Sequence, residues 1–587
     1  MEMAEKEENP ELKAEYTAIS KRIEKVPANP SESFAEALQS LWFVYRCLHM
    51  EDSSGHTFGS LDQVLYSYYR KDIDNGVLTQ DDARDYFYDF WLKFCAAHSI
   101  FEKGGDPSMK AAFPFEVGEP SYRNGLFWSA GMYVATARHV DDGYPINVAG
   151  VDIDGNDLTN ELSWMIIEAV RDLRTFSVKP VVKYSEKTNK DFMNLCYEIL
   201  MDGRSLPSIA YDYNTREALR LEPDNHYTEE DLLKFCNIGC IETAIAGKSF
   251  IDAMNCFMNL PKIMQITVNN GYVGDRLVGL VLEEPEAFED MKNNFSKQLE
   301  YFIGLYTQAQ NGAAPFFNQY FMRPMSSTLM EGCIERAMLL DDGGCTYWCK
   351  SMNCCGIADV ADSLMGLKQV VYDEKKVSLS ALRNILNRDF EGNEAFRQYL
   401  INQVPKYGNG DKEVDMLAKF VVDEYCKYVS ATKTFNGNYF RPGMYSFYGS
   451  AVNLSETTGS LPSGRKRGEV LSLNVAPEHG AVKNGLTAML ESVTTIDHLK
   501  GVNACPVDIQ LTPDTPVAVL DTANKYLNEN NALLLQVTVV NKEDLIEAQK
   551  TPEKYQDLVV RVSGFSARFV VLDKEVQNEI IMRDWTA

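Results

Sequence analysis

Residues 561–567, which read RVSGFSA, are the stretch of sequence that decides the fold. Their central residues, 563–566, lie between two apolar runs rich in β-branched residues, 558–562 and 569–572, which predict two short buried strands joined by a glycine turn. Glycine suits such a turn because it adopts positive φ without strain. Gly564 can also take part in chemistry. Removal of a hydrogen atom from its α-carbon leaves a planar radical that the flanking amide groups delocalise, and no side chain opposes the planar geometry.

A second chemically suggestive stretch is 237–242, which reads NIGCIE. Gly239 precedes the thiol of Cys240 and permits a tight loop, and Glu242 lies two residues further on, on the same side of an extended chain. The cysteine could abstract a hydrogen atom as a thiyl radical while the carboxylate moves a proton. Partial shielding from water would raise the pKa of that carboxylate. Taken alone, however, a buried cysteine near a glutamate is commonplace.

Together the two stretches resemble the glycyl radical enzyme family. Residues 561–567 resemble its R-V-x-G-[YFW]-x-A radical motif, and residues 237–242 resemble the G-C-x-E loop of its dehydratase, lyase and decarboxylase branches. The resemblance runs in the same order from about residue 30 to the end of the chain. The other stretches that resemble the family are residues 34–39, 58–63, 154–162, 356–364 and 458–465.

The resemblance implies a fold. It is an α/β barrel of ten strands, made of two five-stranded parallel halves set antiparallel, in which the glycine and cysteine loops meet. We expect a pyruvate formate-lyase-like barrel domain over residues 1–450 and a C-terminal glycine radical domain over residues 451–587. Most relatives are longer at the N-terminus. We therefore expect a compact subtype, a truncated chain, or a barrel completed by a second polypeptide, and either a homodimer or a hetero-assembly.

The resemblance also implies a mechanism without a bound cofactor. A separate activating enzyme, which uses S-adenosylmethionine and an iron–sulfur cluster, creates the radical at Gly564, and oxygen destroys it. The radical passes to Cys240, and Glu242 acts as general base or acid. The leading hypothesis is a radical lyase that removes water, an amine or a sulfur group from a small polar substrate. The alternatives are a radical decarboxylase of an arylacetate-like acid and a non-catalytic or regulatory subunit of a split enzyme.

Candidate substrate-binding residues are Asp252, His56 and Asp212. In the diol-dehydratase pattern an aspartate falls about fourteen positions after the cysteine, but Met254 stands there, with Asp252 nearby. This difference weakens the case for a substrate like glycerol or propanediol. Formate-lyase activity is disfavoured because glycine, not a second cysteine, precedes Cys240.

Composition excludes several other classes of protein. The 587 residues carry a net charge of −27, which argues against nucleic acid or an anionic membrane as a partner. The 13 cysteines form no regular framework, and the acidic start of the chain does not resemble a signal peptide, so we expect reduced thiols in the cytoplasm. Four clustered cysteines (345, 349, 354 and 355) lack the paired spacing of a zinc site, and we expect no bound metal.

Hydrophobic periodicity predicts interleaved helices and strands over the whole chain, which indicates an α/β protein. A charged stretch at 373–413 is interpreted as a surface insertion. Helices are predicted at 33–50, from about 79 to 94, and at 157–172, 190–202, 229–236 and 286–310. Strands are predicted at 146–153, 533–540, 558–562 and 569–572.

Overall fold

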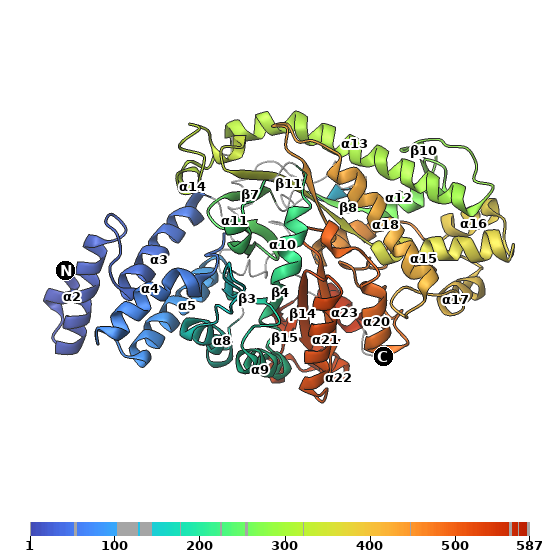
Figure 1. Cartoon of the computed structure of the whole chain (residues 1–587). Coiled ribbons are helices and arrows are strands. Elements are labelled where there is room, and N and C mark those ends of the chain that lie inside the picture. The colour runs from blue at the N-terminus through green and yellow to red at the C-terminus, as the bar shows by residue number, and fades with distance from the viewer. Residues whose placement is uncertain are drawn as a thin grey trace.

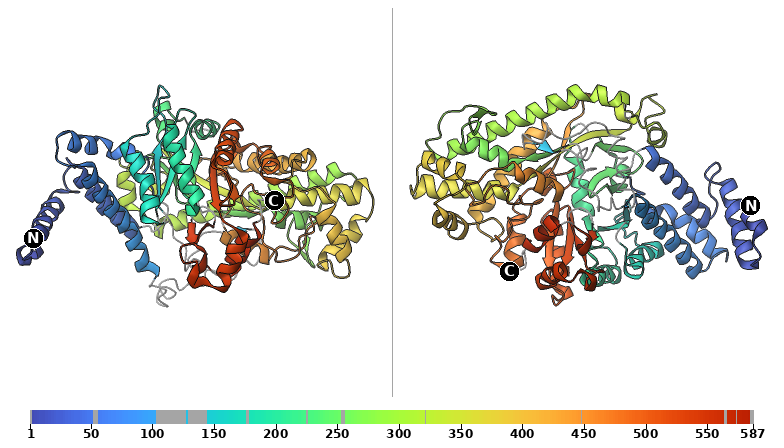
Figure 2. Two further views of the ribbon diagram at one scale, coloured as in Figure 1. Left: turned by 90° about the horizontal axis from the view of Figure 1, so that it is seen from below. Right: turned by 180° about the vertical axis from the view of Figure 1, so that it is seen from behind.

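The structure is a computed structural model, and two main sheets surrounded by helices form its centre (Figure 1). Helices of the N-terminal region lie at one end of the molecule and helices α15 to α17 at the other, as both views of Figure 2 also show. The structure describes residues 2–51, 56–102, 127–128, 144–175, 178–223, 226–252, 256–320, 322–446, 448–562, 566–572 and 574–583.

The first sheet has the strand order β13-β14-β4-β3-β2. Strands β2, β3 and β4 run parallel to one another, and β14 is antiparallel to β4 but parallel to β13. Every residue of β2, β3 and β4 is buried, as expected for parallel strands covered on both faces. The strands are β2 (Tyr144–Ala149), β3 (Val178–Tyr184), β4 (Ser208–Tyr211), β13 (Pro506–Leu511) and β14 (Leu534–Val539).

The second sheet is built around the long buried strand β11, which pairs in parallel with β7, β8 and β12, while β1 is antiparallel to β8. Two backbone hydrogen bonds join this sheet to the chain ahead of β13: Asn503 N–H to Pro442 O (3.1 Å) and Met444 N–H to Ala504 O (2.9 Å). The two sheets are therefore linked along one side. The strands are β1 (Phe127–Trp128), β7 (Ser249–Asp252), β8 (Phe257–Asn259), β11 (Tyr347–Cys355) and β12 (Phe440–Gly443).

Helices pack around both sheets and share one hydrophobic core with them. The N-terminal helices are α2 (Pro10–Lys25), α3 (Phe34–Glu51), α4 (Leu61–Asp74) and α5 (Gln80–Glu102). Helices α8 (Glu161–Leu173), α9 (Lys190–Ile199), α10 (Asp212–Arg220) and α21 (Val517–Glu529) accompany the first sheet. Helices α12 (Leu260–Val268), α13 (Phe288–Tyr320), α15 (Ile357–Leu367) and α18 (Lys412–Ser430) accompany the second.

The predicted helices and strands are present, with shifted boundaries such as the end of β2 at Ala149 and the start of α8 at Glu161, and with three further differences. Helix α11 (Glu229–Leu233) ends early, because the chain enters strand β5 at Phe235. Residues 569–571 form a 3₁₀ turn instead of a strand. The strand that follows the glycine turn is β16 (Ser566–Arg568), and beyond it Phe569 turns into a local core after its N–H bonds to Leu558 O.

The third difference concerns the charged stretch at 373–413. It contains α16 (Leu379–Asn387) and α17 (Glu394–Asn402), and Leu382, Leu386 and Leu400 on these helices are buried in the main core. The stretch is therefore an integral part of the fold. Its charges form one face of amphipathic helices, which the net charge along the sequence does not reveal.

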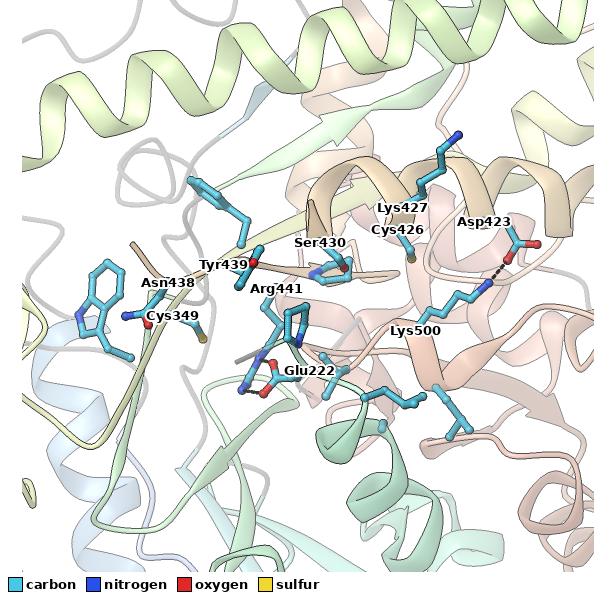
Figure 3. Close-up of a pocket in the computed structure, with 18 residues that line it drawn as sticks. Glu222, Cys349, Asp423, Cys426, Lys427, Ser430, Asn438, Tyr439, Arg441 and Lys500 are labelled. Carbon is cyan, nitrogen blue, oxygen red and sulfur yellow. Dashed lines mark hydrogen bonds and ion pairs between the residues drawn. The ribbon is translucent and has the colours of Figure 1, made fainter. Parts of the chain in front are cut away.

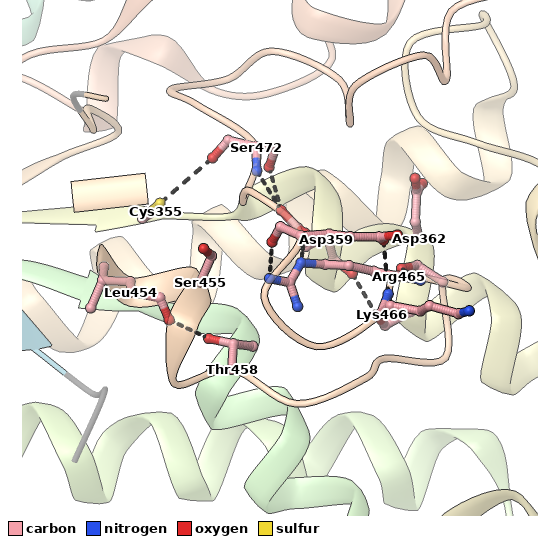
Figure 4. Close-up of polar contacts among 12 residues, drawn as sticks. Cys355, Asp359, Asp362, Leu454, Ser455, Thr458, Arg465, Lys466 and Ser472 are labelled. Carbon is pink, nitrogen blue, oxygen red and sulfur yellow. Dashed lines mark hydrogen bonds and ion pairs between the residues drawn. The ribbon is translucent and has the colours of Figure 1, made fainter. Parts of the chain in front are cut away.

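The loop at 459–464 has glycines spaced much as in a phosphate-binding loop. Its backbone bonds instead to the protein's own side chains, since Arg465 donates a hydrogen bond to the carbonyl of Gly459. Arg465 is buried, with Nε 3.5 Å from Asp359 Oδ1 (Figure 4). The other oxygen of Asp359 accepts hydrogen bonds from Ser472 N–H (2.8 Å) and Oγ–H (2.7 Å). Burial raises the pKa of nearby Asp362 to about 7 and that of Glu478 to about 8. The contacts of Asp359 with Arg465 and Ser472 hold residues 465–472 against α15.

Candidate active site

Cys240 lies at the tip of a β-hairpin, where its side chain is half-buried. Strands β5 (Phe235–Ile238) and β6 (Glu242–Ile245) pair antiparallel, and the last pair joins Ile238 to Glu242. Gly239, Cys240 and Ile241 therefore form the turn. Gly239 has φ of 51°, a left-handed conformation that glycine adopts most readily, which explains why glycine precedes the thiol.

Glu242 folds back onto the backbone of this turn. Its Oε2 accepts hydrogen bonds from the N–H groups of Cys240 (3.1 Å) and Ile241 (3.0 Å). Its Oε1 is buried and has no hydrogen-bond partner among the described residues. Burial raises the pKa of the carboxyl group, although the backbone donors and Lys179 oppose that rise. One oxygen thus orients the group beside the cysteine, while the other can accept a proton.

The hairpin is fixed to the first sheet by buried polar side chains. Lys179 on β3 donates from Nζ to the carbonyl of Gly239 (2.7 Å), immediately before the cysteine. Asn147 on β2 holds the peptide groups of Asn237: its Oδ1 accepts from the N–H (3.1 Å) and its Nδ2 donates to the carbonyl (3.3 Å). The chain that enters the turn is therefore held at two points, and the thiol has a defined position.

The opposite strand of the hairpin is held by β12 of the second sheet and by the chain ahead of β13. Thr243 N–H donates to Asn503 O (3.0 Å), and Arg441 Nη1 donates to Thr243 O (2.5 Å). Arg441 is itself buried and paired with Glu222, whose Oε2 lies 2.8 Å from Nη2. The hairpin thus spans the two sheets.

The predicted glycine turn is framed by a second hairpin, β15 (Val559–Arg561) and β16 (Ser566–Arg568). These strands pair antiparallel, and Arg561 opposite Ser566 is the last pair. The turn between them contains Gly564, which lies outside the described residues together with Ser563 and Phe565. The hairpin, α22 (Lys542–Lys550) and α23 (Lys574–Met582) share a small core of their own, separate from the main core.

Arg561 connects the two hairpins. Its buried guanidinium donates to Ser566 Oγ (3.3 Å) and lies within electrostatic reach of Cys240. With the amide of Gln536 turned so that its oxygen faces Arg561, that oxygen accepts from Nη2 (2.7 Å) and the amide nitrogen donates to Asp508 Oδ1 (3.0 Å). Burial lowers the pKa of Arg561 to about 10, and Asp508 and Cys240 counteract this shift. The guanidinium of Arg561, on the strand that enters the glycine turn, is therefore close enough to Cys240 for a charge–charge interaction.

The structure describes the side chains of two of the three predicted substrate-binding residues, Asp212 and His56. Asp212 is buried at the start of α10, where its Oδ1 accepts from Arg216 Nε (2.8 Å) and its Oδ2 is 3.9 Å from Lys183 Nζ. His56 is half-buried and packs edge-on against Tyr45, with 6.4 Å between the ring centroids. Asp252 ends β7 opposite Lys350, and its side chain lies outside the described part of the structure.

Sequence reasoning missed Lys179, Arg561 and Asp508 as contributors to the site. For Lys179, the sequence pattern of its strand could have revealed the role. Lys179 and Lys183 occur in an otherwise apolar strand and share one of its faces, and both are buried. Buried lysines require polar partners, and here the partners are backbone carbonyls of the cysteine hairpin region, Gly239 for Lys179 and Leu233 for Lys183.

A cavity of about 240 Å³ lies near the Arg441–Glu222 pair (Figure 3). It is lined by residues from α10, β12, α18 and the chain around Lys500, which pairs with Asp423 (2.7 Å) at one side. Cys240 and Glu242 are not among the described residues that line it. The cavity is therefore separate from the thiol and its carboxylate.

Two further properties apply to the described residues only. No group of three or more His, Cys, Asp and Glu side chains among them is arranged to hold a metal ion. None of their helices combines the length and the apolar character that a membrane crossing requires.

Comparison with known proteins places this arrangement in a family. Residues 1–452 match the pyruvate formate lyase-like family and residues 471–570 match the glycine radical family. The chain is 29% identical to the trans-4-hydroxy-L-proline dehydratase of Clostridioides difficile, over 99% of this chain and 71% of that enzyme. It is 28% identical to the (2S)-3-sulfopropanediol dehydratase of Klebsiella oxytoca, over 99% and 69% of the two chains.

A solved structure resembles the fold as a whole. The B12-independent glycerol dehydratase from Clostridium butyricum, in its glycerol-bound form, superimposes with a TM-score of 0.87 at 29% identity, covering 99% of this chain and 71% of that one. The chain belongs to the pyruvate formate lyase-like family of glycyl radical enzymes. It is a radical lyase of the dehydratase type, with an α/β fold and a radical carried by the protein itself.

Proposed function

We propose that Gly564 stores the radical, that Cys240 carries it to the substrate as a thiyl, and that Glu242 moves the proton. The proposal is supported by Arg561, the last residue of the strand before the glycine turn, whose charge interacts with Cys240. The buried Glu242, hydrogen-bonded to the N–H of Cys240, supplies an acid–base group at the same point.

The proposed reaction balances without any added oxidant. The Cys240 thiyl takes a hydrogen atom from a substrate carbon that bears a hydroxyl, which leaves a carbon radical and a thiol. The radical makes the hydroxyl more acidic, so Glu242 Oε1 accepts its proton while the β-leaving group departs with its electron pair. Glu242 returns the proton to a departing hydroxide to give water. The product radical then takes the hydrogen back from the thiol, and the regenerated thiyl recovers a hydrogen from Gly564.

The substrate class follows from the relatives. Their names specify hydroxyproline, a sulfonated propanediol and glycerol, and others are isethionate sulfite-lyases. For this chain we propose a small polar compound that loses water, an amine or a sulfur group. An arylacetate-type decarboxylase and a regulatory subunit are the alternatives. Asp252, His56 and Asp212 remain the proposed substrate-binding residues.

The finer features of the fold and assembly are also proposals. A ten-stranded barrel is supported by the two linked sheets, and a division into residues 1–450 and 451–587 by the family matches over residues 1–452 and 471–570. We further propose activation by a separate S-adenosylmethionine and iron–sulfur enzyme, assembly as a homodimer or with a second polypeptide, and a cytoplasmic location.

Anaerobic electron paramagnetic resonance (EPR) tests the proposal. The protein is incubated with S-adenosylmethionine, a reductant and an activating enzyme, and the spectrum is recorded. We expect a doublet that is absent in Gly564→Ala and present in Cys240→Ala, which should lose turnover. A doublet that persists in Gly564→Ala would place the radical elsewhere. Turnover that survives in Cys240→Ala would favour the regulatory subunit.

A further inference from the structure

Arg583, immediately after α23, donates hydrogen bonds to the chain that enters the glycine turn. Its Nη1 donates to the carbonyl of Arg561 (2.8 Å) and its Nη2 to the carbonyl of Val562 (2.6 Å). In an extended strand, consecutive carbonyls point to opposite sides. A single guanidinium that bonds to both therefore requires the chain to leave the extended conformation here, two residues before Gly564, and β15 does end at Arg561.

Helix α23 also holds the chain that leaves the turn. Gln577 is buried, and its Nε2 donates to the carbonyls of Phe569 and Leu572 (3.0 Å each). These carbonyls follow β16, whereas those held by Arg583 precede the turn. The helix is therefore fastened to both ends of the glycine hairpin, and Arg583 holds the last two described residues before the turn.

Arg583 is itself held by a buried carboxylate. Its Nε and Nη2 donate to Oε1 and Oε2 of Glu579 (2.6 Å each), one helical turn earlier. Glu579 Oε1 also lies 2.9 Å from His479 Nε2. Burial opposes ionisation of Glu579, but Arg583 and His479 together keep the pKa of this carboxyl group below its usual value. The carboxylate is therefore charged, and the fork-shaped pair fixes the plane of the guanidinium.

The arrangement is more specific than stability requires. The apolar core of the hairpin, α22 and α23 already holds these elements together. Removing two charges from water is costly, and apolar residues often replace a buried ion pair without loss of stability. The Arg583–Glu579 pair instead fixes an orientation, because a planar guanidinium sets the orientation of the two peptide groups that it binds.

We propose that Arg583 is a positioning residue for hydrogen-atom transfer. By holding the carbonyls of Arg561 and Val562 it sets the path on which the chain reaches Gly564, and so the approach of the radical to Cys240. Glu579 and His479 act through Arg583. This inference rests on the proposed roles of Gly564 and Cys240.

Hydrogen exchange at the radical measures that approach directly and needs no substrate. After activation the enzyme is transferred anaerobically into D₂O, where the Cys240 thiol exchanges to S–D. The α-carbon radical takes deuterium from the thiol, leaving a thiyl, which then takes the original hydrogen. The net result is a deuterated glycyl radical, with no oxidant consumed, so the EPR doublet from the α-hydrogen collapses to a singlet.

We expect the collapse to be about 100-fold slower in Arg583→Gln, because misplacement by about 1 Å produces losses of that order. The spin yield should stay within about twofold of the unaltered enzyme, since misplacement slows the transfer without removing the stored radical. Arg583→Lys should be intermediate, because lysine cannot bond to both carbonyls in one plane. The matched control is Arg568→Gln, since Arg568 is exposed on the same hairpin and should exchange at the unaltered rate.

Each outcome has a distinct meaning. If Arg583→Gln folds and exchanges at the unaltered rate, Arg583 does not position the turn. If Arg583→Gln fails to fold, His479→Gln replaces it, and a rate equal to that of the unaltered enzyme overturns the proposal. If the doublet of the unaltered enzyme persists in D₂O, or collapses equally fast in Cys240→Ala, the pairing of Gly564 with Cys240 is wrong and the inference falls with it.

Discussion

Replacement of Glu242 by glutamine separates the structural role of this side chain from its chemical role. The amide oxygen of glutamine can occupy the place of Oε2 and accept the N–H groups of Cys240 and Ile241. The amide NH₂ then occupies the place of Oε1, which has no partner among the described residues. The hairpin should therefore keep its conformation, while the proton acceptor is replaced by a donor.

The expected loss of turnover is large. General base catalysis by a positioned side chain contributes about 10²- to 10⁴-fold, so kcat should fall by a factor in that range, equivalent to about 3–5 kcal/mol. The doublet at Gly564 should form to the same extent, because storage of the radical does not involve the carboxylate. Spin counting by EPR and turnover on the same activated sample measure both quantities.

The role of Glu242 as a base also predicts how activity changes with pH. Burial raises the pKa of Glu242, and a base must be deprotonated, so activity should rise with pH through that raised pKa. Glutamine should abolish this rise. Stability has the opposite trend: the raised pKa favours the folded state below the unfolded pKa, and this contribution is lost as pH rises through the folded value. Glu242→Gln should therefore be relatively more stable at high pH.

One result would refute the reasoning. If Glu242→Gln keeps kcat within about threefold of the unaltered enzyme, well short of the usual contribution of a general base, the carboxylate does not move the proton. The matched control is Glu230→Gln, which changes an exposed glutamate close to the same hairpin and should alter neither kcat nor its pH dependence.

Three further predictions concern groups around the site. Lys179→Met removes the donor to the carbonyl before the cysteine, and turnover should fall about 10- to 100-fold at unchanged spin yield, because the thiol is misplaced; an unchanged kcat would contradict this. Arg561→Lys should slow the exchange of the Gly564 α-hydrogen in D₂O, since lysine cannot contact Ser566 and the Asp508–Gln536 pair together. The rate at which the EPR doublet collapses measures this exchange, and an unaltered rate would contradict the prediction. Burial raises the pKa of Glu478 to about 8, so the thermal unfolding temperature should fall as pH rises from about 4 through 8. It should fall less in Glu478→Gln. If the unfolding temperature falls equally with pH in both proteins, Glu478 does not contribute to it.

The sequence by itself predicted candidate residues for the chemistry and determined most of the helices and strands. Gly564, Cys240 and Glu242 were predicted because they lie in two short stretches that resemble motifs of the glycyl radical enzyme family. The helix predicted at 33–50 is α3, and the strand at 533–540 is β14, because hydrophobic periodicity is a local property. The turn of Phe569 out of the strand was not predicted, because pairing of β15 with β16 decides it.

Only the tertiary structure decided what holds these residues in place. Lys179 bonds to a carbonyl 60 positions away. Arg561 bonds to Gln536 and interacts through its charge with Asp508 and Cys240, and these three residues come from separate parts of the chain. Such contacts leave no periodic signal, because they depend on how strands are ordered in the sheets. The sequence therefore specifies which atoms can react, and the packing of distant segments specifies whether those atoms meet.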